Sequence, residues 1–294
     1  MGTPAVIVLS FDPMIEVVDL VMRWQTIGVT AAVLIGLVVA AIYGAGILRT
    51  QRDATALRLD DMVYIILGVV PGAVVGGRIV HAIVFWEYYA ADWTRLFDVS
   101  VGALSLTGAV IGGTLSAYYI ARLIGAPARR WADVAAISLL LTLGLGKFAQ
   151  LLGGSGQGAF FDGPWAVAFA PPGPWVSPLP GVPAHPPPVY EGIWLLIAVP
   201  VAAFLYASRA KLRARKLALG AADDGGGLFV AFMLWFLLGR FVIGFTWRDD
   251  AVLGPLNAEQ VIALVLFVGV IVGGLYRRSR SSLKPKLLMS PRRS

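Results

Sequence analysis

The 294-residue sequence contains no cysteine and only two histidines, His81 and His185. Without thiols the chain forms no disulfide, has no thiolate nucleophile and offers no sulfur ligand to zinc. Two histidines are also too few for most zinc sites. The sequence therefore predicts no metal centre, and we expect no other cofactor.

Charged residues are scarce as well. They make up 14% of the chain, whereas apolar residues make up 58%, and the mean hydropathy is +0.77. This composition excludes an ordinary soluble domain and is typical of polytopic membrane proteins. The net charge of +7 does not indicate a nucleic-acid partner, because the basic residues are distributed as membrane topology requires.

Seven segments are long and apolar enough to be spanning helices, which need about 20 mostly apolar residues. We therefore predict an all-α membrane domain over residues 1–276, followed by a basic tail at 277–294. The segment at 15–24 is weakly amphipathic and is expected to lie along the membrane interface. The predicted spans are 26–48, 62–85, 101–121, 133–152, 191–207, 227–246 and 259–276.

The third predicted helix carries small residues at four-residue spacing, namely Gly108, Gly112 and Ser116. Such a stripe allows the backbone of a neighbouring helix to approach closely. We interpret it as a packing surface.

The connections between the predicted spans differ in basic charge. Of the 24 Lys and Arg residues, 18 lie in the connections on one side of the membrane or in the tail, and three lie on the other side. The positive-inside rule then places the N-terminus outside and the C-terminus in the cytoplasm. The basic connections are 49–61, 122–132, 208–226 and the segment after residue 276.

The long connection at 153–190 contains neither Lys nor Arg and is rich in proline, glycine and aromatic residues. Proline and glycine at this density prevent long helices. We predict an extracytoplasmic cap near the membrane–water boundary.

Three cations remain inside the predicted spans, Arg78, Lys147 and Arg240. A cation at membrane depth costs about 2.5–3.5 kcal/mol on insertion scales, so it usually has a partner or a task. Each could pair with a carboxylate or extend to the interface. Carboxylates are scarce within the predicted spans, and Asp133 and Glu191 both lie at helix ends. We therefore expect the three cations to outnumber the carboxylates that could pair with them. We predict that the three come together around an anionic lipid headgroup.

Several blocks around these cations resemble the prolipoprotein diacylglyceryl transferases. The family signature, roughly G-R-x-G-N-F-x-N-x-E-x-x-G, is similar to GKFAQLLGGSGQG at 146–158. The similarity extends over about 23–276. Other similar blocks follow in the same order: GGRI at 76–79, LSLTGAVIG at 104–112, HPPPVYE at 185–191, GRF at 239–241 and LNAEQVIA at 256–263.

The resemblance implies an enzyme of the bacterial cytoplasmic (inner) membrane that moves the diacylglyceryl group of phosphatidylglycerol onto the lipobox cysteine of a preprolipoprotein. Its partners would be that lipid, the lipobox peptide and the membrane. By matching position, the resemblance implies catalytic roles for Arg240, Lys147 and Gln150. It implies substrate-binding roles for Arg78, Thr107, Gly158, His185, Tyr190 and Glu191.

The chain also departs from the family pattern, in ways that remove candidate proton-transfer groups. Three functions therefore stay open: a divergent transferase, a catalytically silent relative that binds anionic lipid or lipoprotein precursor, and a small-solute transporter. The last is less consistent with the sequence, which lacks repeated halves. The family's third-helix histidine is Thr107 here, its signature arginine is Lys147, its asparagines are Gln150 and Gly153, its glutamates are Ser155 and Gly244, and a first-helix tyrosine is Gln25.

Overall fold

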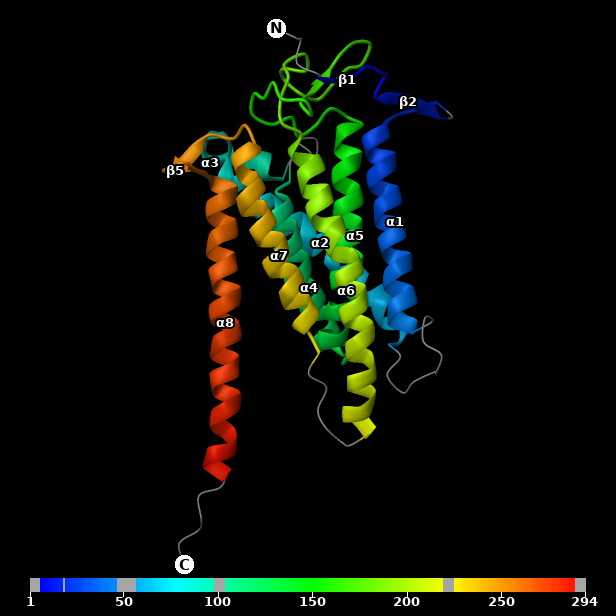
Figure 1. Ribbon diagram of the computed structural model, residues 1–294, viewed down its shortest axis with the longest axis vertical. Helices are drawn as coiled ribbons and strands as arrows, with labels where there is room; N and C mark the ends of the chain where they lie inside the picture. The colour runs from blue at the N-terminus through cyan, green and yellow to red at the C-terminus, as the bar shows by residue number, and fades with distance from the viewer. Residues whose placement is uncertain (1–5, 18, 47–56, 98–103, 219–224, 289–294) are drawn as a thin grey trace, which may run out of the picture.

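The computed structural model describes residues 6–17, 19–46, 57–97, 104–218 and 225–288, and most of them are helical (Figure 1). Seven long helices lie within these ranges, each overlapping one predicted span. The N-terminus lies at one end of the bundle and the C-terminus at the other. The long helices are α1 (Trp24–Ala45), α2 (Leu59–Val84), α4 (Leu106–Leu123), α5 (Ala128–Leu151), α6 (Pro187–Ala218), α7 (Gly227–Ile243) and α8 (Ala258–Leu288).

Six of the described helices are long and apolar enough to cross a membrane, which makes the chain a multi-pass membrane protein. They are α1, α2, α5, α6, α7 and α8. The remaining predicted span corresponds to α4, which is not among these six. With 18 residues it is shorter than every other long helix except α7. Apolar side chains on the outer faces of α1, α2 and α8 are exposed, as expected for surfaces that face lipid.

The core of the bundle forms around α5, whose side chains pack against three neighbouring helices. Val134, Ile137 and Leu140 of α5 are almost fully buried. They share one cluster with Phe236 of α7 and Leu195 of α6. Because α5 is central, the side chains that it presents near its C-terminal end lie inside the protein rather than in lipid.

Glycines bring α2 and α4 into backbone contact, which confirms the packing role predicted for the small-residue stripe. A Cβ at Gly112 would overlap the carbonyl oxygen of Gly72, and one at Gly108 would overlap that of Gly76. Ser116, the third member of the stripe, donates a hydrogen bond of 2.7 Å to the Gly68 carbonyl. The short approach therefore depends on the absence of side chains.

The all-α expectation needs a correction, because three two-stranded sheets lie at the end of the bundle that carries the N-terminus (Figure 1). The amphipathic segment at 15–24 belongs to an antiparallel hairpin of β2 (Met14–Val17) and β3 (Leu20–Arg23). Strand β1 (Ile7–Leu9) pairs in parallel with β4 (Val167–Phe169) of the long α5–α6 connection, and β5 (Ala251–Leu253) pairs with β6 (Leu256–Asn257) between α7 and α8.

The pairing of β1 with β4 gives the α5–α6 connection a core of its own. Val167, Ala168 and Phe169 are all buried, and the ring of Trp175 packs against Phe169 and Phe11. Between α5 and α6 the structure assigns β4 and no helix, which confirms the prediction that the prolines and glycines of this connection prevent long helices. The pairing itself joins residues about 160 positions apart, which local sequence patterns do not reveal.

Helix α8 continues to Leu288, into the segment predicted as a basic tail. Extending an existing helix adds one hydrogen bond per residue without a new nucleation cost. The polar composition after residue 276 therefore does not end the helix.

The N-terminal end of α7 is fixed by a carboxylate of α5. Asp133, which is buried, accepts hydrogen bonds of 2.9 Å from the backbone N–H groups of Gly226 and Leu228 and one of 3.3 Å from Phe229. These N–H groups have no partner within their own helix, and their positive dipole end favours an anion. Asp133 therefore fixes the start of the helix that carries Arg240.

We expect Gly112→Ala to lower the melting temperature of the purified protein, because its Cβ forces α2 and α4 apart. Overpacking of this kind costs about 1–3 kcal/mol. Gly273→Ala is the matched control, since a Cβ at this position of α8 meets nothing within 4 Å. Equal melting temperatures for the two variants would contradict the backbone-contact interpretation.

Candidate functional site

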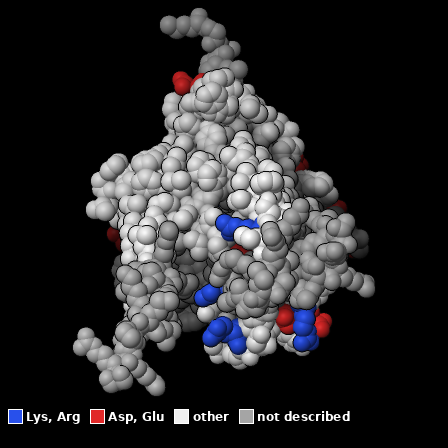
Figure 2. Space-filling view, turned by 60° about the horizontal axis from the view of Figure 1, so that its bottom comes forward, with Lys and Arg blue, Asp and Glu red and all other residues white. Residues whose placement is uncertain are grey.

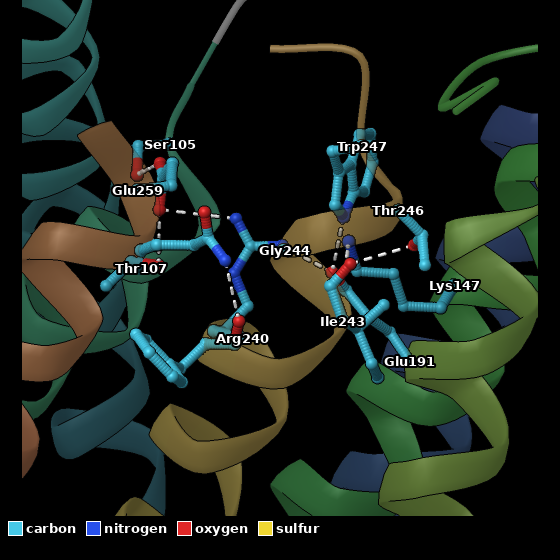
Figure 3. Close-up of polar contacts among 12 residues, drawn as sticks. Ser105, Thr107, Lys147, Glu191, Arg240, Ile243, Gly244, Thr246, Trp247 and Glu259 are labelled. Carbon is cyan, nitrogen blue, oxygen red and sulfur yellow. Dashed lines mark hydrogen bonds and ion pairs between the residues drawn. The ribbon is translucent and has the colours of Figure 1, made fainter. Parts of the chain in front are cut away.

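The ends of five long helices meet below the α5–α6 connection and place charged side chains together inside the protein. Lys147 lies near the C-terminal end of α5 and Glu191 near the N-terminal end of α6. Arg240 lies near the end of α7, and Glu259 lies in the first turn of α8. Figure 3 shows these side chains pointing toward one another, with Thr107 of α4 beside Glu259.

Glu191 bridges the two cations. Its Oε2 atom lies 2.6 Å from Lys147 Nζ, and its Oε1 atom lies 2.6 Å from Arg240 Nη1. The indole of Trp247 donates a third hydrogen bond, of 3.0 Å, to Oε1. Since the Glu191 side chain is only 4% exposed, this carboxylate is fully engaged by internal partners.

Trp247 also covers the two cations. Its ring lies 5.4 Å from Lys147 Nζ and 6.0 Å from the guanidinium carbon of Arg240. Cations are attracted to the face of an indole at such distances, and more strongly where water is excluded. Trp247 therefore stabilises both charges while hydrogen bonding to their shared counter-ion.

The second half of the site centres on Glu259. Its Oε2 atom lies 3.2 Å from Arg240 Nη2 and accepts a hydrogen bond of 2.7 Å from Thr107. Its Oε1 atom accepts one of 2.5 Å from Ser105. Ser105 also caps α4, because its hydroxyl accepts a hydrogen bond from the Gly108 N–H.

The expectation that the cations outnumber their partners was wrong for Lys147 and Arg240. Two carboxylates, Glu191 and Glu259, balance these two cations. Sequence reasoning missed Glu259 and Trp247. An acidic residue in the first turn of a helix is usually explained by the helix dipole alone, which hides its reach toward another helix.

Arg78 lies on α2, at the side of the bundle that α2 forms with α3 (Trp86–Ala90). Its Nη1 atom donates a hydrogen bond of 3.4 Å to the hydroxyl of the fully buried Tyr89. The same hydroxyl lies 2.9 Å from Nδ1 of His81. The structure therefore joins Lys147 and Arg240 through one carboxylate, whereas the contact described for Arg78 is with a tyrosine.

Gln150 follows Lys147 by one helical turn and brings an amide to the same end of α5. Its Oε1 atom is buried and has no hydrogen-bond partner in the part of the chain that the structure describes. Next to it, Ser155 donates hydrogen bonds to the Gln150 carbonyl and to Oε1 of Gln25. Three positions that depart from the family pattern thus lie together, on the α1 side of Lys147.

Gly158 and His185 of the α5–α6 connection form a second group with Tyr190, which directly precedes Glu191 in α6. The Gly158 N–H donates to the His185 carbonyl at 2.9 Å. Nδ1 of His185 lies 3.0 Å from the Tyr190 hydroxyl, and the His185 ring stacks on Phe161. Burial lowers the pKa of His185 from its ordinary value, which favours the neutral ring.

Gly158 is closely surrounded, since a Cβ there would overlap the carbonyl oxygen of Thr246. Its own carbonyl accepts a hydrogen bond of 3.1 Å from Nε of Arg248. The α5–α6 connection is thereby attached to the segment that follows α7 and carries Trp247.

No group of three or more His, Asp or Glu residues with metal-binding geometry lies in the described ranges of the chain. The acidic residues of the site are occupied by cations and hydroxyl groups instead.

Comparison with known families gives one match, which covers residues 13–276 and carries the description prolipoprotein diacylglyceryl transferase. The chain belongs to this family. The match includes every long helix of the bundle up to residue 276 and every residue of the site described above.

Individual members of the transferase family are distant but cover most of the chain. The phosphatidylglycerol–prolipoprotein diacylglyceryl transferase of Clostridioides difficile is 25% identical over 80% of this chain and 86% of its own length. That of Halalkalibacterium halodurans is 29% identical over 84% and 82%, respectively. That of Trichormus variabilis is 27% identical over 95% and 94%.

The structure explains how this member of the transferase family accommodates a glycine at 244. A Cβ there would overlap the buried side chain of Gln260, which accepts a hydrogen bond from the Asn257 N–H and donates one to the Phe241 carbonyl. Gln260 therefore fills the space where the family pattern has a glutamate side chain.

We expect Glu191→Gln to destabilise the protein more than any other single change in the site, because it leaves Lys147 and Arg240 side by side without their shared anion. Removing one partner of a buried ion pair costs about 3–5 kcal/mol. The measurement is the thermal unfolding midpoint in detergent. Glu87→Gln, which removes an exposed carboxylate of α3, serves as the control. A Glu191→Gln midpoint within a degree or two of the control would show that the ion pairs contribute little.

Proposed function

We propose that the chain transfers the diacylglyceryl group of phosphatidylglycerol to the lipobox cysteine thiol of a prolipoprotein in the bacterial cytoplasmic membrane. The observation that carries this proposal is the convergence of Lys147 and Arg240 on one buried carboxylate, at matching positions of a chain that belongs to the transferase family. The relatives are named for this same transfer.

The reaction needs stabilisation of a leaving phosphate. The thiol sulfur attacks the glyceryl carbon, the bond from this carbon to the phosphate oxygen breaks, and glycerol phosphate leaves with both bonding electrons. The thiol proton passes to water or to the leaving phosphate. Cationic donors held where charge develops lower the barrier most when they are fixed in advance.

In this proposal Arg240 and Lys147 stabilise the developing phosphate charge. Arginine presents a planar fork that fits phosphate oxygens, and lysine acts as a point charge. Glu191 positions both cations and does not act as a proton acceptor, because both of its oxygens are already paired with internal donors. Gln150 adds a neutral amide. Its buried Oε1 has no hydrogen-bond partner among the described residues, and in this proposal it accepts a hydrogen bond from a hydroxyl of the glycerol headgroup.

The remaining predicted residues are proposed to bind substrate. Arg78 would contact the lipid headgroup from the α2 side, and Thr107 would act through the Glu259 carboxylate. Gly158, His185 and Tyr190 lie on the segment that leads into Glu191 and would contact the lipobox peptide or the headgroup.

We further propose seven spans, with α4 as the seventh, the N-terminus outside and the segment at 153–190 as an extracytoplasmic cap on a membrane domain that ends near residue 276. Helix α4 has 18 residues, or about 27 Å at 1.5 Å per residue, close to the thickness of the hydrocarbon core. Exposed arginines lie at the end of the bundle opposite the site, and Figure 2 shows basic side chains on this end. They include Arg58, Arg122, Arg129 and Arg209.

Turnover tests the proposed activity. We expect purified protein, given phosphatidylglycerol and a lipobox peptide, to form a diacylglyceryl thioether that mass spectrometry detects. Neutralising either cation, by Lys147→Gln or Arg240→Gln, should lower the rate by about 10²–10³-fold, which is typical for removal of one donor to developing negative charge.

Lys147→Arg is the matched variant, because it keeps the charge at this position, and it should retain most of the activity that Lys147→Gln loses. Binding of phosphatidylglycerol without any thioether would contradict the transferase proposal and favour a catalytically silent relative. The departures at Thr107 and Gly244 make this second function the one to test against.

The absence of cysteine makes topology easy to test, because each introduced cysteine is the only one in the chain. In intact cells, a membrane-impermeant maleimide should label Asp162→Cys in the α5–α6 connection and should leave Arg122→Cys unlabelled until the cells are opened. The reverse pattern would overturn the proposed orientation.

A further inference from the structure

Arg240 has two carboxylate partners, and they differ in distance and exposure. The Glu191 contact is 2.6 Å long, and the Glu191 side chain is 4% exposed. The Glu259 contact is 3.2 Å long, and the Glu259 side chain is 17% exposed. Of the two anions, Glu259 therefore lies farther from Arg240 and is the more exposed.

Glu259 does not depend on Arg240 for its position. Ser105 and Thr107 each donate a short hydrogen bond to it, one to each carboxylate oxygen (Figure 3). Thr107 is fully buried and Ser105 caps α4, so both donors are fixed by the bundle itself. The carboxylate would stay in place, and stay hydrogen bonded, if Arg240 turned to another anion.

The guanidinium is likewise held without Glu259. Its Nη1 remains on Glu191, and the face of Trp247 lies nearby. The Nε atom is buried and has no hydrogen-bond partner in the described part of the structure. Glu191 thus anchors the guanidinium through Nη1, and Nη2 is the nitrogen that points toward Glu259.

We propose that Glu259 is a positioning residue that serves as an exchangeable counter-ion of Arg240, and that a phosphate group of a glycerol-based ligand displaces it from Nη2. The ligand is the headgroup of phosphatidylglycerol or the glycerol phosphate that leaves. This inference rests on the proposed function for the identity of the phosphate, but its test measures binding alone.

The position of Glu259 supports this role. In the family pattern the carboxylate near this arginine follows it by four residues on the same helix, where this chain has Gly244, and Gln260 occupies the space beside that glycine. Here the carboxylate reaches Arg240 from the first turn of α8, and the two hydroxyl groups of α4 hold it there.

The test is the affinity of the purified full-length protein for phosphatidylglycerol and, separately, for glycerol phosphate, measured by titration calorimetry in a neutral detergent. Glu259→Gln removes the competing charge and keeps the size of the side chain. We expect it to bind phosphate ligands about tenfold more tightly, which corresponds to ~1.4 kcal/mol. Asp250→Asn, which removes an exposed carboxylate between α7 and α8, should change the affinity less than twofold.

Thr107→Val should have the opposite effect. Without the threonine hydroxyl, Oε2 of Glu259 relies on Arg240 alone, so a phosphate displaces it less readily and the affinity falls several-fold. A purely structural role for the network predicts the same sign for both variants, because both would loosen the site.

Tighter binding by Glu259→Gln together with weaker binding by Thr107→Val supports the exchange. Unchanged or weaker binding by Glu259→Gln overturns it. If Glu259→Gln cannot be purified, Thr107→Val decides, since unchanged or tighter binding by that variant also overturns the proposal. A response to glycerol phosphate alone would assign the exchange to the product, and a response to the lipid alone would assign it to the substrate headgroup. Absence of thioether formation by the wild type would contradict the proposed function and would leave this binding test intact.

Discussion

The rest of the site depends on one interaction, the pairing of the Glu191 carboxylate with both Lys147 and Arg240. Lys147 and Arg240 come from different helices, and two cations at this separation would repel each other strongly in a medium of low dielectric constant. A single anion between them, 2.6 Å from each, converts that repulsion into two attractions. The three helices α5, α6 and α7 must therefore meet at one depth, or one of the charges is left buried and unpaired.

The rest of the bundle serves this requirement. Asp133 fixes the far end of α7, so the depth of Arg240 is set from a point about four helical turns away. The glycine contacts between α2 and α4 hold the start of α4, from which Ser105 and Thr107 reach Glu259. At the other side, the Arg248 contact with Gly158 joins the α5–α6 connection to the segment that positions Trp247.

Much of this arrangement is predictable from sequence, because a membrane restricts what helices can do. Long apolar runs predict the helices, and a lysine or arginine inside such a run predicts a buried polar site. The partners were harder to predict. Glu259 sits in the first turn of its helix, where an acid is ordinary, and nothing local distinguishes an acid that caps its own helix from one that reaches a neighbouring helix. Trp247 lies outside the predicted spans, and the β1–β4 pairing joins segments far apart in the chain. These features depend on tertiary contacts, which a single sequence does not encode locally.

The lysine at 147 is consistent with a phosphate site despite replacing the arginine of the family pattern. A lysine needs only one of the two oxygens of Glu191 and leaves the other to Arg240. Lys147 Nζ has three N–H donors, and its ion pair with Oε2 of Glu191 uses one, while the Trp247 ring lies over the ammonium group. The remaining donors suit a point contact with a phosphate oxygen. In the proposed reaction Arg240 would therefore supply the directional contact to phosphate and Lys147 the charge, while Glu191 pairs with both cations in the structure.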